Sequence, residues 1–245
     1  MAKQRVDLLL VAQGLVESRT RAQALIMAGL VYAGTARVAK AGDLLPEDVV
    51  LSVKGQEHPW VSRGGMKLAH GLAHFGLDPA GCIGLDVGAS TGGFTDVLLT
   101  RGAEAVYAVD VGHGQLAWKL RSDQRVIVLE KTNARYLTQE MITAPITALV
   151  CDASFIGLQT ILPAGLALCV PGAFAVALIK PQFEAGADKV GKGGVVRDPA
   201  VHQEVCARIE EWFSNLPDWK VLGITPSPIK GPEGNVEFLI GAIRQ

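Results

Sequence analysis

Two charged residues follow apolar runs in the middle of the chain, where a buried sheet would present them to a reactant. Asp152 comes just after residues 146–150, and Lys180 directly follows residues 174–179. In a doubly wound sheet the carboxyl ends of the strands lie at one edge, which is where such folds bind ligands. A lysine after a wholly apolar strand is partly shielded from water, a setting in which lysines take part in catalysis. The alternative is a structural ion pair with Asp152.

Two further charges are placed where they can converge on this pair. Lys67 stands at the start of a predicted helix over residues 67–75. Glu237 lies in the last predicted strand, among apolar residues. These four side chains, two of each sign, are therefore candidates for one site.

A glycine-rich stretch over residues 84–94 marks a ligand site. It reads G-L-D-V-G-A-S-T-G-G-F, follows an apolar run and precedes an apolar segment with helical spacing. This is the pattern of a first strand, a tight turn and a helix N-terminus in an α/β domain. Glycines at such a turn let the backbone bend sharply and approach a ligand closely.

The spacing within this stretch favours S-adenosylmethionine over a dinucleotide. Ser90 occupies the position where a dinucleotide fingerprint has its second glycine. Asp86, just before the first turn glycine Gly88, suits a ligand with a cationic amino-acid tail. Asp110 ends the second strand, where a carboxylate can accept hydrogen bonds from both hydroxyls of a ribose.

The apolar runs from residue 82 onward predict an α/β fold with a Rossmann-like, seven-stranded sheet. They alternate with helical segments, as in a doubly wound sheet. The last two runs are close in sequence and should form an antiparallel hairpin at one edge, an ending that separates methyltransferase sheets from dinucleotide-binding ones. The predicted strands span residues 82–87, 106–109, 126–129, 146–150, 174–179, 221–225 and 236–243.

One uncharged segment, residues 158–179, has the length of a membrane span. Pro163 lies near its start, and Pro171 with Gly172 interrupts it. We therefore predict a helix, a turn at these two residues and a buried strand from residue 173, with no membrane segment.

The N-terminal part predicts a separate small α+β domain. Its boundaries are expected at residues 1–57, with a linker over 58–61 and the large domain over 62–245. Helices are predicted over residues 6–12 and 19–28, and short strands over 30–33, 36–38 and 49–53.

This small domain is basic at its start. The first 40 residues carry six basic side chains against two acidic ones. Arg19 and Arg21 fall in the first turn of a helix, where the helix dipole disfavours positive charge, so a contact with phosphate is an attractive role for them. The alternative is a solvated charged face.

Several motifs resemble known families. R-V-D-L-L-L, S-R-T-R-A-Q-A-L-I-M-A-G-L-V and K-A-G-D resemble the S-four, or alpha-L, type of RNA-binding module. The whole chain looks like the TlyA family of ribosomal RNA 2′-O-methyltransferases, often labelled haemolysin A, within the wider FtsJ-like group. The motifs that carry this second resemblance are S-R-G-G-M-K-L, L-D-V-G-A-S-T-G-G-F-T-D, V-D-V-G-H-G-Q-L, L-E-K-T-N-A-R, C-D-A-S-F-I, L-I-K-P-Q-F-E and G-N-V-E-F-L.

The resemblance implies an enzyme that uses S-adenosylmethionine to methylate a ribose 2′-hydroxyl in ribosomal RNA or a ribosomal subunit. It implies a catalytic tetrad of Lys67, Asp152, Lys180 and Glu237. It implies cofactor contacts at Asp86, Gly88, Ser90, Gly92, Asp110, Asn133 and Asp152. We expect RNA contacts at Arg5, Arg19, Arg21, Lys40, Arg63, Lys189 and Lys192.

Chemistry agrees with this assignment. A ribose hydroxyl is a weak acid and a sulfonium methyl is an activated electrophile, so the enzyme has mainly to align the two and help remove the proton. Lys180 serves either as the base or only as a group that positions the hydroxyl.

Other activities fit the residues less well. The turn after Asp152 lacks the prolines usual in enzymes that methylate amino groups, and Cys151 points away from Asp152 on its strand. Residues 186–193 nearly spell a phosphate-binding loop but lack its Ser/Thr. His70 and His74 have no obvious acidic third ligand, so we expect no metal.

The composition is that of a cytoplasmic protein with a substantial core. The formal net charge is −1, so the overall charge of the protein does not attract nucleic acid. The four cysteines are widely spaced in the sequence. We expect no membrane contact and no protein partner. Two alternatives are a membrane-lytic haemolysin, which would need a secretion signal or an insertion segment, and an RNA-binding protein without catalysis, which the intact tetrad disfavours.

Overall fold

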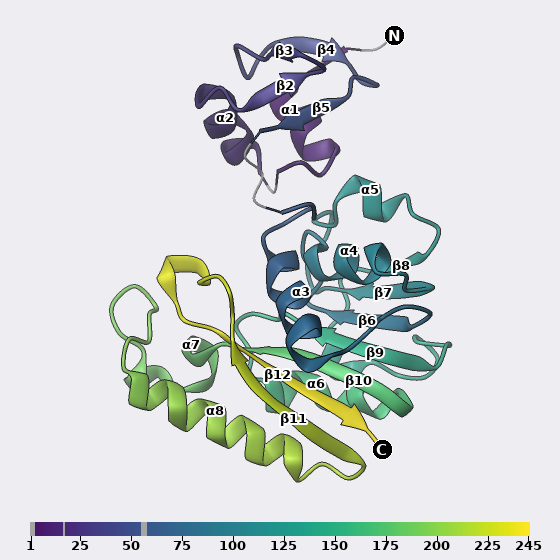
Figure 1. The fold of residues 1–245 in the computed structure, drawn as a ribbon, viewed down its shortest axis with the longest axis vertical. Coiled ribbons are helices and arrows are strands. Elements are labelled where there is room, and N and C mark those ends of the chain that lie inside the picture. Colours follow the sequence, from purple (N-terminus) through teal and green to yellow (C-terminus); the bar gives the residue numbers. More distant parts are fainter. Residues whose placement is uncertain (1–2, 17, 55–57) are drawn as a thin grey trace.

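The computed structural model describes residues 3–16, 18–54 and 58–245. They form a small N-terminal domain and a larger α/β domain, drawn one above the other in Figure 1. The predicted domain boundary at residue 57 lies outside the described residues. Val61, in the predicted linker, packs on the large domain: it is 3% exposed, and its N–H donates to Asp96 Oδ2 at 2.8 Å.

The N-terminal domain packs two short helices and short strands around Val6, Leu10, Ile26 and Val31. Both predicted helices and all three predicted strands are present. β1 and β4 pair antiparallel and are too short to give a sequence pattern. The elements are β1 (Lys3–Arg5), α1 (Val6–Ala12), α2 (Arg19–Met27), β2 (Val31–Ala33), β3 (Ala36–Arg37), β4 (Leu44–Pro46) and β5 (Leu51–Val53).

The large domain contains a seven-stranded sheet with the order β11-β12-β10-β9-β6-β7-β8. β12 is antiparallel to both of its neighbours, and the other pairings in the sheet are parallel. The predicted Rossmann-like fold and its terminal antiparallel hairpin are confirmed. The strands are β6 (Ile83–Val87), β7 (Ala105–Val109), β8 (Val126–Leu129), β9 (Ile146–Cys151), β10 (Cys169–Ile179), β11 (Trp219–Pro226) and β12 (Phe238–Arg244).

Helices cover both faces of this sheet and bury an apolar core on each side. One face carries α3 (Gly64–Phe75), α4 (Gly93–Thr100) and α5 (Trp118–Arg121). The other carries α6 (Leu158–Ala167) and α8 (Pro199–Ser214), with the 3-10 turn η1 (Ala134–Tyr136) against α6. The short elements α7 (Pro181–Glu184), η2 (Ala187–Lys189) and η3 (Pro232–Gly234) lie in the loops that follow β10 and β11.

One sequence prediction about this core is wrong. Pro171 and Gly172 do not form a turn between a helix and a strand, because β10 already begins at Cys169 and runs through both residues. The pairing with β9 shifts register between Cys169 and Phe174, and Gly172 has a φ of 83°, so the pair forms an irregularity inside the strand. No helix in the described part of the chain is long and apolar enough to cross a membrane.

Strand register brings the predicted site residues to one edge. Phe238, the first residue of β12, pairs with Ile179, the last residue of β10. Glu237 and Lys180, the residues just outside this pair, therefore lie side by side. Ala177 pairs with Cys151, which brings the carboxyl end of β9 and Asp152 to the same edge.

Candidate active site

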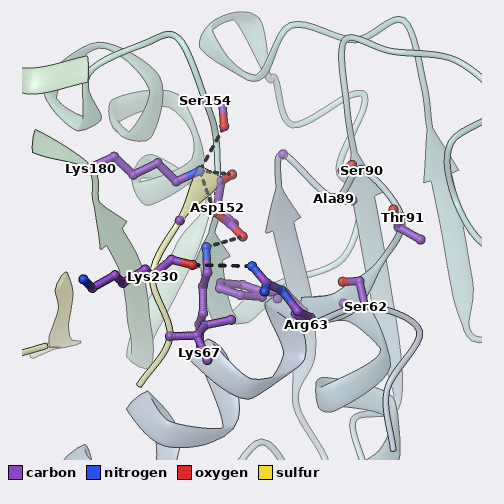
Figure 2. Close-up of a pocket in the computed structure, with 16 residues that line it drawn as sticks. Ser62, Arg63, Lys67, Ala89, Ser90, Thr91, Asp152, Ser154, Lys180 and Lys230 are labelled. Carbon is purple, nitrogen blue, oxygen red and sulfur yellow. Dashed lines mark hydrogen bonds and ion pairs between the residues drawn. The ribbon is translucent and has the colours of Figure 1, made fainter. Parts of the chain in front are cut away.

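Lys67, Asp152, Lys180 and Glu237 form one continuous chain of ion pairs with alternating charge. Lys67 Nζ lies 2.6 Å from Glu237 Oε2 and 3.7 Å from Asp152 Oδ2. Lys180 Nζ lies 2.6 Å from Asp152 Oδ1. Figure 2 shows Lys67, Asp152 and Lys180 pointing toward one another from three different elements. The structure thus brings the four predicted residues together, and we refer to them as the tetrad.

The tetrad is largely shielded from water. Lys67 is 7% exposed, Lys180 6% and Glu237 1%. Charges this deeply buried persist only when paired, and removal of one partner from a buried pair typically costs about 3–5 kcal/mol. Two ammonium groups and two carboxylates sum to zero charge, so the group compensates itself. The Asp152 side chain is the most open at 22% exposed, so this end of the chain faces the surrounding clefts.

Small residues allow helix α3 to place Lys67 at the sheet edge. A Cβ on Gly65 would lie 2.7 Å from the Trp60 ring, and a Cβ on Gly93 would lie 2.9 Å from the Gly65 nitrogen. Such distances are not tolerated between real atoms, so a side chain at Gly65 would displace Trp60, and a side chain at Gly93 would push α3 away from α4. The S-R-G-G-M-K motif therefore positions Lys67 by close packing of backbone on backbone.

Only one of the two carboxylate oxygens of Glu237 has a hydrogen-bond partner among the described residues. Its Oε2 accepts a hydrogen bond from the Lys67 ammonium, whereas its Oε1 is buried without such a partner. Gly231 packs directly against that oxygen, and a Cβ on Gly231 would overlap it. The loop between β11 and β12 thus closes over the carboxylate through a glycine.

Two clefts open beside the tetrad and share a wall. The first, here called the tetrad cleft, has a volume of about 300 Å3 and is shown in Figure 2. The second, here called the side cleft, has a volume of about 510 Å3. The residues that line both clefts are Gly88, Ser90, Asp152 and Ser154. A group bound in one cleft can therefore meet a group bound in the other at Asp152.

The glycine turn forms much of this shared wall. Gly88 has a φ of 82°, and a Cβ there would lie 2.8 Å from the Ala153 Cα, so only glycine fits. Asp110 holds the turn from the side: its Oδ2 accepts from the Ser90 N–H at 2.8 Å and its Oδ1 from the Gly112 N–H at 2.7 Å. Asp110 and Asn133 both line the side cleft.

The chain matches two family models, the S4 domain over residues 4–51 and the FtsJ-like methyltransferase over residues 60–244. It is 46% identical over 237 residues to the 16S/23S rRNA (cytidine-2′-O)-methyltransferase TlyA of Mycobacterium tuberculosis (strain ATCC 25618 / H37Rv), which covers 96% of this chain and 88% of that protein. The chain belongs to the TlyA family of FtsJ-like methyltransferases.

Two further relatives cover nearly the whole chain. YqxC of Bacillus subtilis (strain 168), a candidate rRNA methyltransferase, is 48% identical over 239 residues, which is 97% of this chain and 85% of that protein. A solved structure of a candidate hemolysin from Streptococcus thermophilus has 43% identity and a TM-score of 0.76, covering 100% of this chain and 90% of that one.

Two residues of the TlyA-type glycine motif do not reach either cleft, although the sequence predicts cofactor contacts for both. Asp86 is completely buried, and its Oδ2 accepts from the Thr95 N–H at 2.9 Å and the Thr95 hydroxyl at 2.6 Å. Gly92, with a φ of 97°, packs against Leu116 and Leu120. Asp86 therefore anchors the start of α4, and Gly92 makes room for the segment before α5.

Burial also changes the acidity of groups in this region. Desolvation raises the pKa of Asp86 to about 7 against the hydrogen bonds from Thr95, which lower it. Burial raises the pKa of the Cys151 thiol to about 12, so this cysteine is not a nucleophile near neutral pH. Within the described chain no group of three or more His, Cys, Asp and Glu side chains is arranged to hold a metal ion.

In the N-terminal domain of this TlyA-family chain, two of the predicted RNA-binding arginines have an internal partner. Arg5 donates to Asp7 Oδ1 at 3.0 Å and Oδ2 at 2.9 Å, and Arg19 Nε donates to Asp7 Oδ2 at 2.8 Å. Asp7 is fully buried, and these arginines hold the pKa of its carboxyl far below the usual range. Arg5 and Arg19 thus pair with the buried Asp7 through side chains that are still 41% and 53% exposed, and Arg21 and Lys40 are exposed as well.

The remaining predicted RNA contacts lie on the large domain. Arg63 is exposed and lines the tetrad cleft, where its Nη2 is 3.5 Å from the Lys230 carbonyl oxygen. Lys189 donates to both carboxylate oxygens of Glu204 at 2.7 Å. Lys192 is exposed in the loop that follows η2. The structure thus brings Arg63 to the tetrad, whereas Lys189 has an acidic neighbour.

Three site residues give no clear signal in the sequence. Ser154 Oγ accepts a hydrogen bond from Lys180 Nζ at 2.9 Å, Lys230 lines the tetrad cleft, and Phe155 lines the side cleft. Phe155 is 89% exposed and has a φ of 65°, a left-handed conformation that is costly for an aromatic residue. Only the position of Ser154 and Phe155 two and three residues after Asp152 could have singled them out.

The raised pKa of Asp86 predicts a pH dependence of stability. The folded protein keeps a proton on Asp86 up to about pH 7, whereas an unfolded aspartic acid loses it near pH 4. Stability should therefore fall as the pH rises from about 4 to about 7, by at most about 1.4 kcal/mol per pH unit from this group, and level off above that. In Asp86→Asn this contribution is absent.

Thermal unfolding from pH 4 to pH 8 checks this prediction. The Tm of Asp86→Asn relative to the unmodified protein should rise from pH 4 to about pH 7 and change little above that. Asp48→Asn, at an exposed position, serves as the control and should follow the unmodified protein. Parallel curves for Asp86→Asn and the unmodified protein would show that Asp86 is ionised throughout.

Proposed function

We propose that this chain transfers the methyl group of S-adenosylmethionine to a ribose 2′-hydroxyl of ribosomal RNA. The observation that carries the proposal is the buried Lys67–Asp152–Lys180–Glu237 tetrad at the wall between two clefts. The similar TlyA protein of Mycobacterium tuberculosis is named as a 16S/23S rRNA (cytidine-2′-O)-methyltransferase. An arrangement with two adjoining clefts suits a reaction between two bound substrates.

The side cleft fits the cofactor. Its volume of about 510 Å3 lies within the range of about 300–1,000 Å3 usual for small-molecule sites. Asp110 brings carboxylate oxygens that can accept from ribose hydroxyls, and Gly88 lets the ligand approach the backbone. Apolar residues including Val109, Ala134 and Ile156 line the remainder and suit an adenine ring. When bound, S-adenosylmethionine supplies an electrophilic methyl group on a sulfonium.

The tetrad cleft fits the RNA. Arg63 brings positive charge to its rim beside the Lys230 carbonyl, and Ser62 and Thr91 add hydroxyls. Phe155, exposed at the neighbouring cleft, presents a ring on which an unpaired base can stack. Of the tetrad, Lys67, Asp152 and Lys180 line this cleft, so a nucleotide bound there would lie beside these three charges.

The tetrad contributes chiefly alignment and electrostatics. The ribose hydroxyl must lose its proton as its oxygen takes the methyl group, either to a Lys180 side chain that is neutral when the RNA binds or to water in the open cleft. Negative charge that develops on the oxygen as the proton leaves is stabilised by the Lys67 ammonium and, when water takes the proton, by the Lys180 ammonium as well. Asp152 forms ion pairs with both lysines, and Glu237 forms a second ion pair with Lys67. Because the site is shielded from water, these interactions are stronger than they would be in solvent.

The N-terminal domain is proposed to dock on structured RNA. It matches the S4 domain over residues 4–51, and Arg21 and Lys40 are exposed on it. The chain as a whole has a net charge of −1, so RNA affinity must come from such local groups.

Replacement of Lys180 tests the proposed chemistry. Lys180→Met keeps the aliphatic stem and removes the charge, so methyl transfer to ribosomal subunits should fall about a hundredfold or more, while S-adenosylmethionine still binds. Transfer is measured with labelled cofactor, and cofactor binding by calorimetry. Lys220→Met, at an exposed position of β11, is the control. Transfer by Lys180→Met at a rate within threefold of the unmodified protein would refute the catalytic role.

Replacement of Arg21 and Lys40 tests the docking role. The double variant Arg21→Ala, Lys40→Ala should bind ribosomal RNA more weakly, and the slope of log affinity against log salt should fall by about 2. Affinity for S-adenosylmethionine should not change. Arg19→Ala should in addition lower the Tm, because Asp7 loses an ion pair. An unaltered salt slope in the double variant would argue against RNA docking by this face.

A further inference from the structure

Lys180 has as many close partners as an ammonium group has hydrogens. Its Nζ lies 3.0 Å from the Asp152 main-chain oxygen, 2.6 Å from Asp152 Oδ1 and 2.9 Å from Ser154 Oγ. The dashed lines in Figure 2 mark these three contacts. A long, flexible lysine side chain is thereby held in one direction, with its charge facing Asp152 and Ser154.

The three partners differ in their chemistry. The Asp152 carbonyl and the ionised Asp152 carboxylate can only accept hydrogen bonds. The Ser154 hydroxyl can accept from an ammonium and can also donate to a neutral amine. Ser154 is therefore the one partner of the three that satisfies Lys180 whether or not the lysine carries its third proton.

Ser154 also lies where the reaction must take place. It lines both the tetrad cleft and the side cleft, so its hydroxyl stands at the junction of the two. The local backbone fixes it there: Asp152 N–H donates to the Val87 carbonyl at 3.1 Å, and the strained φ of Phe155 turns the chain directly after Ser154. A ribose hydroxyl, which is likewise both donor and acceptor, has to reach Lys180 at this junction.

We propose that Ser154 is a positioning residue that directs the Lys180 side chain at the junction of the two clefts and supports it through changes of protonation. This inference rests on the proposed function. Asp152 keeps Lys180 in the site without Ser154, because two of the three contacts remain. Loss of the Ser154 hydroxyl should therefore disturb the direction of Nζ and not the fold, since Ser154 itself is exposed.

Steady-state kinetics test the effect on the reaction. Ser154→Ala should lower kcat for methylation of ribosomal RNA about tenfold, with KM for RNA and for S-adenosylmethionine within twofold and an unchanged Tm. Ser154→Thr, which keeps the hydroxyl and has room for a methyl at this exposed position, should restore kcat to within threefold. Ser214→Ala, at the exposed end of α8, is the matched control. A wild-type kcat in Ser154→Ala would overturn the proposal.

Nuclear magnetic resonance of 15N-labelled lysine side chains gives a readout in the protein without substrates. The Lys180 ammonium signal, assigned by its loss in Lys180→Arg, should exchange its hydrogens severalfold faster in Ser154→Ala and at the original rate in Ser154→Thr. Equal exchange in all three proteins would overturn the proposal. Failure of the unmodified protein to methylate ribosomal RNA would instead refute the proposed function, and the exchange rates would still decide whether Ser154 orders Lys180.

Discussion

The site edge of the large domain depends on the pairing of four charges, three of them buried and one, Asp152, partly exposed. Glu237, Lys67, Asp152 and Lys180 alternate in sign, and none of the three buried groups could remain ionised without its neighbour. Each comes from a different part of the chain: the loop before β12, helix α3, and the ends of β9 and β10. The register of β9, β10 and β12 sets Asp152, Lys180 and Glu237 at one edge of the sheet, and the ion pairs of Lys67 hold α3 at the same edge.

The shared wall of the two clefts follows from that edge. The glycine turn packs on Ala153 so closely that Gly88 admits no side chain, and this brings the turn beside Asp152. A carboxylate that is part of the tetrad thus also borders the side cleft. Because Gly88 packs on Ala153, a cofactor bound beside the glycine turn also lies beside Asp152 of the tetrad. The fold itself therefore aligns the two proposed substrates.

The sequence predicted the elements with strong periodicity and the residues that chemistry requires at strand ends. The seven strands, helices α1 and α2, and the assembly of the tetrad follow from apolar runs and from the rule that parallel strands end at one edge. Roles that depend on three-dimensional contacts could not be predicted from the apolar runs or from the ends of the strands. Asp86 turns inward to Thr95, Arg19 turns to the buried Asp7, and Pro171 enters a strand because an irregularity accommodates it. Ser154 became visible only through its distance to Lys180.

The identity of the methylated atom tests the central claim most directly. Ribosomal subunits from cells that lack this protein are incubated with the unmodified protein and S-adenosylmethionine carrying a deuterated methyl group, and the RNA is digested to nucleosides for mass spectrometry. The account predicts that the labelled methyl group is on the ribose. In the undigested RNA, the phosphodiester on the 3′ side of that nucleotide should resist alkali, because its 2′-oxygen is methylated. Label on a base, or no label in either subunit, would contradict it.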